Sequence, residues 1–136
     1  MKQQRHEFSA LGGYYISDLF SGTYVLGGAY TPYGARKGDV YDPASNTWSK
    51  RADMPTARNH AAAGVIDDRI YVAGGRAGSV FIPNALNLDL VEEYNPATDQ
   101  WVLRAPMPTA RSATTWGVHG GRLYVAGGEI RHRDIW

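Results

Sequence analysis

The sequence contains no cysteine. A chain without thiols has no disulfide framework, no thiolate nucleophile and no cysteine-based metal site. Its four histidines are dispersed and lack the short spacings of zinc motifs, so we expect neither a metal nor any other cofactor. The lack of cysteine fits a reducing compartment, which slightly favours the cytoplasm and leaves other locations open.

The chain also lacks a long hydrophobic run and a strong net charge. No window reaches the roughly 18 apolar residues of a membrane-spanning helix. Residues 1–8 precede no continuous apolar segment, which argues against a signal peptide. With a formal net charge of +1, electrostatics give no reason to expect a nucleic acid or an anionic membrane as partner. The chain is instead rich in glycine and tyrosine, which is typical of short strands joined by tight turns.

An internal repeat organises the sequence. The order Trp48, then Met-Pro-Thr-Ala-Arg58, then Tyr-Val-Ala-Gly-Gly75 returns 53 residues later, with Trp101 and Arg111 at the equivalent positions. A fixed period near 50 residues indicates a repeat architecture in which each copy is one supersecondary unit.

Each full copy predicts four antiparallel strands, because runs of strand-forming residues alternate with turn residues. In the middle copy the strands are expected at residues 61–66, 69–73, 89–94 and 100–104, with a loop at 76–88. Residues 14–16 are a candidate for a degenerate first strand of the preceding copy. In the Tyr-Asp/Asn-Pro turns, Asp42 and Asn95 are expected to accept hydrogen bonds from backbone amides.

The glycine pair Gly74 and Gly75 removes two Cβ atoms at the end of a strand. We expect bulky rings, Trp48 and Trp101, to lie flat on the backbone at such pairs. A phosphate-binding loop is a poor alternative, because neither glycine pair opens a helix. The adjacent acids Asp67-Asp68 and Glu92-Glu93 are expected to serve a turn and a strand surface.

Gly-Gly, then Tyr and Trp separated by six residues, then Met-Pro-x-x-Arg, recurring at this period, resembles the kelch repeat. The resemblance covers residues 23–128 and implies an all-β, partial propeller built from four-stranded antiparallel blades. It implies a single partial propeller over residues 1–136. Its expected parts are an incomplete blade with an irregular N-terminus (1–55), a complete blade (56–108) and a truncated blade (109–136).

The chain holds about two and a half repeats, whereas propellers usually close with four to eight blades. An open array of blades exposes apolar flanks and unpaired strand edges. We therefore expect either a fragment of a longer kelch chain or copies that self-associate to cover these surfaces.

The repeated arginines Arg58 and Arg111 have two readings. They form either a cationic ring that binds acidic ligands, or structural contacts to backbone carbonyls of the adjacent blade, which recurrence favours. The resemblance to kelch adaptors of ubiquitin ligases implies ligand-binding residues at neighbouring, non-recurring rim positions, which are Asn59, His60, Arg76, Ser112 and Glu129.

The resemblance implies a non-enzymatic binding scaffold that recognises a protein or peptide through rim loops. The alternative is a fragment of a carbohydrate-active kelch enzyme, such as a sialic-acid mutarotase, in which Glu129 would act with Arg76 or Arg111. A copper oxidase of this family is disfavoured, because it needs a cysteine cross-linked to tyrosine. A piece without independent activity is the third reading.

Overall fold

The computed structural model describes residues 14–18, 22–26, 38–77 and 86–129. Every regular element in these ranges is a β-strand. Accordingly, the described ranges offer no helix with the length and apolar character to cross a bilayer. The strands form two four-stranded sheets, one two-stranded sheet and one short hairpin, with all pairings antiparallel.

The first sheet has four strands in chain order. They are β1 (Tyr14–Asp18), β2 (Gly22–Leu26), β3 (Gly38–Asp42) and β4 (Thr47–Arg51). The candidate strand at residues 14–16 is therefore present and longer than expected, because β1 pairs with β2 along its whole length. This sheet thus has four strands, where the sequence predicted an incomplete blade.

The second sheet is the central one. It contains β5 (Ala62–Ile66), β6 (Arg69–Ala73), β9 (Val91–Asn95) and β10 (Gln100–Arg104), and its order is β10-β9-β6-β5. Between β6 and β9 lies a small hairpin of β7 (Arg76–Ala77) and β8 (Leu86–Asn87). The expected loop at 76–88 therefore contains paired strands in its described part. The last sheet holds β11 (Thr115–His119) and β12 (Arg122–Ala126).

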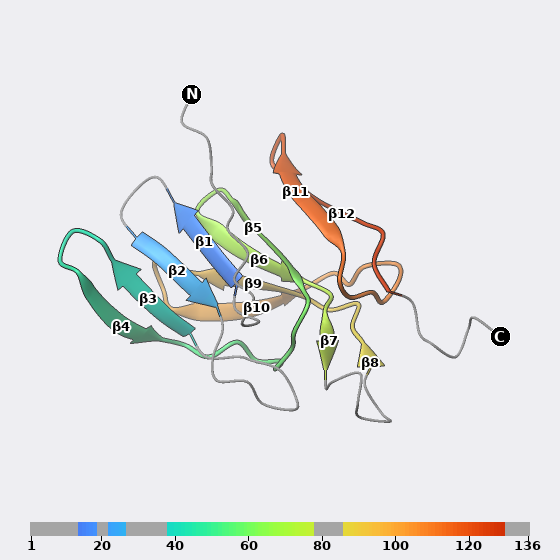
Figure 1. Cartoon of the computed structure of the whole chain (residues 1–136), viewed down its shortest axis with the longest axis horizontal. Helices are drawn as coiled ribbons and strands as arrows, with labels where there is room; N and C mark the ends of the chain where they lie inside the picture. Colours follow the sequence, from blue (N-terminus) through green and yellow to red (C-terminus); the bar gives the residue numbers. More distant parts are fainter. Residues whose placement is uncertain (1–13, 19–21, 27–37, 78–85, 130–136) are drawn as a thin grey trace.

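The three sheets stack side by side as blades, with β5 in the middle of the stack (Figure 1). Strand β5 contacts β1 on one side and β11 and β12 on the other. Burial falls across the central sheet, from a mostly buried β5 to a mostly exposed β10. This gradient from an inner to an outer strand is that of propeller blades, so the expected all-β, partial propeller fold is confirmed.

Small residues allow β5 to lie between two sheets. Ala62 and Ala63 are fully buried, and a Cβ atom on Gly64 would lie 2.5 Å from the Val118 Cγ2 atom and 3.1 Å from the Leu123 Cδ1 atom. A larger residue at position 64 would push the third sheet away from the second.

Turn chemistry explains where the strands end. Asp67 and Asp68 join β5 to β6 with φ of 47° and 57°, the left-handed values that a two-residue type I′ hairpin requires. Gly120 and Gly121 occupy the same place between β11 and β12, with φ of 55° and 69°. The predicted turn at Asp67-Asp68 is confirmed.

The Asp/Asn-Pro turns are also as predicted. The Oδ1 atom of Asp42 accepts a hydrogen bond from the Ala44 amide at 2.9 Å, and Asn95 accepts one from Ala97 at 3.0 Å. The Ser45 hydroxyl, with the Ala44 amide, holds the pKa of Asp42 below its usual value.

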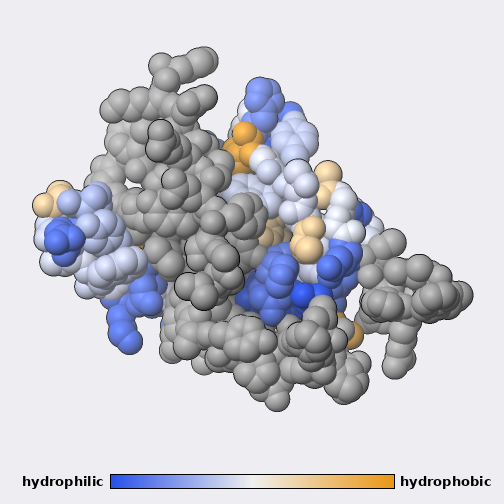
Figure 2. Space-filling view, viewed as in Figure 1, coloured by the Kyte–Doolittle hydropathy of each residue, from blue (hydrophilic) through white to orange (hydrophobic). Residues whose placement is uncertain are grey.

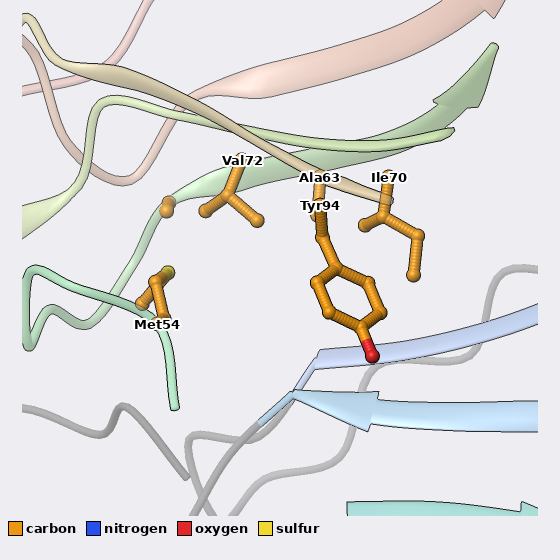
Figure 3. Close-up of a cluster of buried hydrophobic side chains, with 6 residues drawn as sticks. Met54, Ala63, Ile70, Val72 and Tyr94 are labelled. Carbon is orange, nitrogen blue, oxygen red and sulfur yellow. The ribbon is translucent and has the colours of Figure 1, made fainter. Parts of the chain in front are cut away.

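The apolar core lies between the first and second sheets. Figure 3 shows its side chains pointing from β5, β6 and β9, and from the segment after β4, into one space. Burying side chains the size of Met54, Ile70 and Val72 stabilises the fold by about 1.5–3 kcal/mol each. The buried members are Met54, Ala61, Ala63, Ile70, Val72 and Tyr94.

Tyr94 and Trp101 tie the outer half of the second sheet to the first. Their ring centroids lie 5.0 Å apart. The Trp101 indole donates to the Ala52 carbonyl at 3.0 Å, and Asp99 accepts from the Ala52 amide at 2.8 Å and from the Tyr94 hydroxyl at 2.7 Å. These two hydrogen bonds lower the pKa of Asp99, the amide having the larger effect.

The prediction that tryptophan rings cover the glycine pairs is wrong. A Cβ atom on Gly74 would instead meet the Arg111 carbonyl oxygen at 2.6 Å and the Met107 Cε atom at 2.7 Å, both from the connection to the next blade. Trp101 lies on the outer strand β10, against Tyr94. The glycines are required because neighbouring backbone approaches closely at positive φ.

Candidate functional site

Arg58 is the most buried charged side chain at the rim, with 1% of its surface exposed. Its Nη1 atom donates to the carbonyls of Gly74 at 3.0 Å and Leu90 at 3.2 Å, and its Nη2 atom lies 2.7 Å from the Glu92 Oε2 atom. Thr56 donates to the other oxygen of the same carboxylate at 2.7 Å. A buried charge needs this density of partners, so Arg58 is structural.

Arg111 repeats one of these contacts in the next copy. Its Nη1 atom donates to the Gly127 carbonyl at 2.7 Å, which is the Gly74 contact shifted by one repeat. The reading of these arginines as backbone-binding residues agrees with this geometry. However, their carbonyl partners belong to the same repeat, so the predicted contact to the adjacent blade is wrong.

The five predicted ligand-binding residues lie together where β6 and β12 end. Asn59 and Arg76 form an isolated antiparallel bridge, with their amides donating to each other's carbonyls at 2.9 and 2.8 Å. Ser112 and Glu129 form the equivalent bridge in the next repeat. The Ala113 amide donates to the His60 carbonyl at 3.0 Å and so joins the two bridges.

An ion pair crosses from one repeat to the next within this group. The Arg76 Nη1 atom lies 2.9 Å from the Glu129 Oε2 atom, and the two side chains are 10% and 56% exposed. The Nε atom of Arg76 is buried and has no hydrogen-bond partner among the described residues. Hydrophilic colours predominate in Figure 2 where the β7–β8 hairpin meets the C-terminal end of β12.

The five residues differ in their access to a ligand. Ser112 is fully buried and donates to Asn87 Oδ1 at 2.9 Å, so it positions its neighbours. His60 is exposed, and its Nδ1 atom lies 2.7 Å from the Asn59 Oδ1 atom. Exposed side chains at this rim therefore come chiefly from His60 and Glu129, and Asn59 is half-buried.

Asn87 belongs to the same surface and was not singled out from the sequence. Its Nδ2 atom donates to the Glu129 carbonyl at 2.7 Å, and its Oδ1 atom accepts from Ser112. The available signal was its place in the 76–88 segment, which is longer than its counterpart in the first copy. Asn87 thereby links the β7–β8 hairpin to the third repeat.

A second group of titratable side chains surrounds Glu93 on the opposite face of β9 from Glu92. The Arg104 guanidinium, bonded to the carboxylate at 2.6 Å, lowers the pKa of Glu93, and the Tyr71 hydroxyl bond adds to this. Burial, followed by the bond to Glu93, raises the pKa of Tyr71. Glu92 and Glu93 do point to opposite faces, but both are buried, so their predicted role on a strand surface is wrong.

Neither group resembles a metal centre. Among residues 38–77 and 86–129, no cluster of three or more His, Asp or Glu side chains has the geometry to hold a metal ion. For sugar chemistry the sequence suggested Glu129 with either Arg76 or Arg111. Glu129 contacts Arg76, whereas the side-chain hydrogen bond of Arg111 among the described residues goes to the Gly127 carbonyl.

Comparison with known proteins places the middle of the chain in a described family. The profile of the kelch motif matches residues 57–108. One solved structure, that of YjhT, superposes with a TM-score of 0.71 at 27% identity, covering 86% of this chain and 34% of that one.

Curated relatives extend the similarity over most of the chain. Beta-scruin from Limulus polyphemus is 43% identical over 89 residues, which is 65% of this chain and 9% of that protein. Alpha-scruin from the same animal is 36% identical over 119 residues, covering 82% and 12%. Kelch-like protein 25 from Homo sapiens is 33% identical over 135 residues, covering 96% and 22%. The chain thus spans about a tenth to a fifth of the length of these relatives.

Proposed function

Because this chain belongs to the kelch-repeat family, we propose that it is a non-enzymatic binding scaffold whose rim recognises a protein or peptide. The observation that carries the proposal is the gathering of non-recurring residues at one place. His60 faces the same surface as Ala113, and Arg76 pairs with Glu129, although repeat equivalence alone would make each pair alike. Variable side chains on a rigid β scaffold suit recognition.

The exposed groups define the ligand chemistry. Glu129 neutralises Arg76, so an acidic peptide has little cationic charge left to meet at this point. The Oε1 atom of Glu129 can accept a hydrogen bond from a ligand, and His60 offers an exposed ring. The matching ligand is an extended peptide with a cationic donor group, such as lysine or arginine.

The proposal also includes the face of the third sheet that points away from the second sheet. A Cβ atom on Gly117 would meet nothing within 4 Å, whereas its counterpart Gly64 is packed against Val118 and Leu123. The outward face of the third sheet is therefore uncovered among the described residues. Self-association or further blades would cover it, and the mass of the chain in solution distinguishes a monomer from an assembly.

The test is selection from a phage-displayed library of random peptides on the immobilised full chain. Enriched peptides are resynthesised, and their affinity is measured by fluorescence anisotropy. We expect a shared motif with a basic residue, and a loss of affinity of about tenfold for Glu129→Gln and for His60→Ala, as for one lost polar contact to a charged group.

The matched controls are Gln100→Ala and Thr98→Ala, two exposed positions on the outer part of the second sheet. Both should retain full affinity, and all variants should keep the wild-type circular dichroism spectrum. Selection without a shared motif, or a motif whose binding ignores His60 and Glu129, would count against recognition at this rim.

A further inference from the structure

The main chain of Glu129 is held in place by two other segments. Glu129 lies beyond the end of β12, after Gly127 and Gly128, whose φ angles of 65° and 94° are positive. Two glycines leave the backbone much conformational freedom, so they fix the position of Glu129 poorly. The Glu129 amide donates to the Ser112 carbonyl at 2.7 Å, and the Glu129 carbonyl accepts from the Asn87 Nδ2 atom at 2.7 Å. These two hydrogen bonds therefore determine where Glu129 stands.

The carboxamide of Asn87 is itself fixed at both ends. A carbonyl can only accept, so the amino group of Asn87 must face Glu129, and the Oδ1 atom then accepts from the buried Ser112 hydroxyl at 2.9 Å. In the preceding repeat the equivalent carbonyl, that of Arg76, accepts from the main-chain amide of Asn59. A side chain thus does at Glu129 what the main chain does at Arg76.

The guanidinium of Arg76 depends in turn on Glu129. Its Nη1 atom lies 2.9 Å from the Glu129 Oε2 atom, and the Arg76 side chain is only 10% exposed. Its buried Nε atom has no hydrogen-bond partner among the described residues. A buried cation that loses its counter-ion is destabilised, so a displacement of Glu129 would also move Arg76.

We propose that Asn87 is a positioning residue for the rim: its carboxamide fixes Glu129, and through it Arg76, so that the Glu129 Oε1 atom is presented to a cationic group of the ligand. This inference rests on the proposed function, because it concerns the same rim and the same ligand chemistry. Asn87 sets affinity without touching the ligand. An acceptor that is already fixed loses less conformational entropy on binding, and it therefore binds more tightly than a mobile one.

The test variant combines Asn87→Leu with Ser112→Ala, which removes the carboxamide and leaves no buried hydroxyl without its acceptor. Fluorescence anisotropy measures its affinity for the basic peptides enriched on the wild-type chain. We expect a loss of about tenfold, like that of Glu129→Gln. Adding Glu129→Gln to the variant should weaken binding little further, because both changes act through one carboxylate. Asn95→Leu, the same replacement at the far end of β9 from the rim, is the matched control and should keep full affinity.

A second measurement needs no ligand. NMR spectroscopy of the ¹⁵N-labelled chain follows the rotation of each guanidinium group about its Nε–Cζ bond, which an ion pair slows. Arg76→Lys assigns the signal of Arg76. Its rotation should be slow in the wild type and in Asn95→Leu, and as fast in the test variant as in Glu129→Gln. An unchanged circular dichroism spectrum shows that faster rotation is not a loss of fold.

The two measurements separate this proposal from the proposed function. Slow rotation of Arg76 in the test variant overturns the positioning role, as does a loss of affinity that adds in full to that of Glu129→Gln. Fast rotation, with no peptide enriched on the wild-type chain, supports the positioning role and contradicts the proposed function alone. If the test variant does not fold, Asn87→Asp takes its place, because it keeps the acceptor for Ser112 and removes the donor to the Glu129 carbonyl.

Discussion

Arg76 and Glu129 occupy equivalent positions in consecutive repeats and are paired with each other, the Nη1 and Oε2 atoms being 2.9 Å apart across 53 residues of sequence. The repeat brings identical positions of adjacent blades side by side. A sequence difference between copies therefore becomes a contact between unlike side chains.

This pair should couple the second and third blades weakly. Because Glu129 is more than half exposed, a double-mutant cycle with Arg76→Gln and Glu129→Gln should give a coupling energy of about 0.5–1 kcal/mol. Chemical denaturation measures it. Thr98→Gln replaces Glu129→Gln in the control cycle and should show no coupling to Arg76. A coupling energy near zero in the first cycle would mean that solvent screens the pair completely.

Gly74 and Gly127 offer a comparison at the same backbone angle. Both have φ of 65°, but a Cβ atom would lie 2.6 Å from the Arg111 carbonyl oxygen at Gly74, whereas at Gly127 it would meet none of the described residues within 4 Å. Gly127→Ala should cost only the left-handed strain, about 1–2 kcal/mol. Gly74→Ala should cost about 1–3 kcal/mol more, because the clash is with backbone. Equal shifts of the urea midpoint for the two variants would show that the backbone at Arg111 moves away from the new Cβ atom at little cost.

Arg58 and Arg111 should differ sharply in their contribution to stability. Arg58→Leu leaves the carboxylate of Glu92 buried without its cation and should destabilise the fold by about 3–5 kcal/mol. Arg111→Leu should cost about 1 kcal/mol, since it loses a single hydrogen bond recorded among the described residues. Adding Glu92→Gln to Arg58→Leu should recover part of the loss, as thermal melts would reveal. If Glu92→Gln recovered no stability, the loss in Arg58→Leu would come from packing and not from the unpaired carboxylate.

Because of Glu93, the free energy of unfolding should decrease at acid pH. The Arg104 hydrogen bond holds its folded pKa below the ordinary value of 4.5. At intermediate pH the unfolded chain therefore binds the proton first, so this contribution is fully present above the ordinary pKa and is lost as pH falls through the folded pKa. Glu93→Gln should reduce stability at pH 7, and its difference from wild type should shrink towards pH 2. Urea titrations across this range measure the difference, and a constant gap would contradict the assignment.

Local chemistry explains why most of the fold could be predicted. The turn at Asp67-Asp68 and the Asp42 and Asn95 caps are set by neighbours in sequence, and the 53-residue repeat carries them from copy to copy. The β7–β8 hairpin escaped prediction because Arg76–Ala77 and Leu86–Asn87 form two-residue strands without an alternating pattern.

Periodicity is silent on contacts between repeats, and this explains the error about the tryptophan rings. A tryptophan near a glycine pair in sequence suggests a ring on the backbone, yet Trp101 reaches the Ala52 carbonyl of the preceding connection. The structure brings the five rim residues together, because positions one period apart adjoin. The hydrogen bond from Ser112 to Asn87 was not predictable, because Asn87 lies in the β7–β8 hairpin, which the sequence pattern did not reveal.

The shared spacing of the contacts between blades has a consequence for how such a chain changes over generations. The Trp101 indole reaches back to Ala52, and the Gly75 amide reaches forward to Arg111, so the middle copy forms a joint with the connection on each of its two sides. Duplicating or deleting one whole copy in the gene leaves every joint matched. An insertion of a few codons between residues 105 and 113 would shift the Arg111 carbonyl away from Gly74 and Gly75, so copy number is free to change where connection length is not.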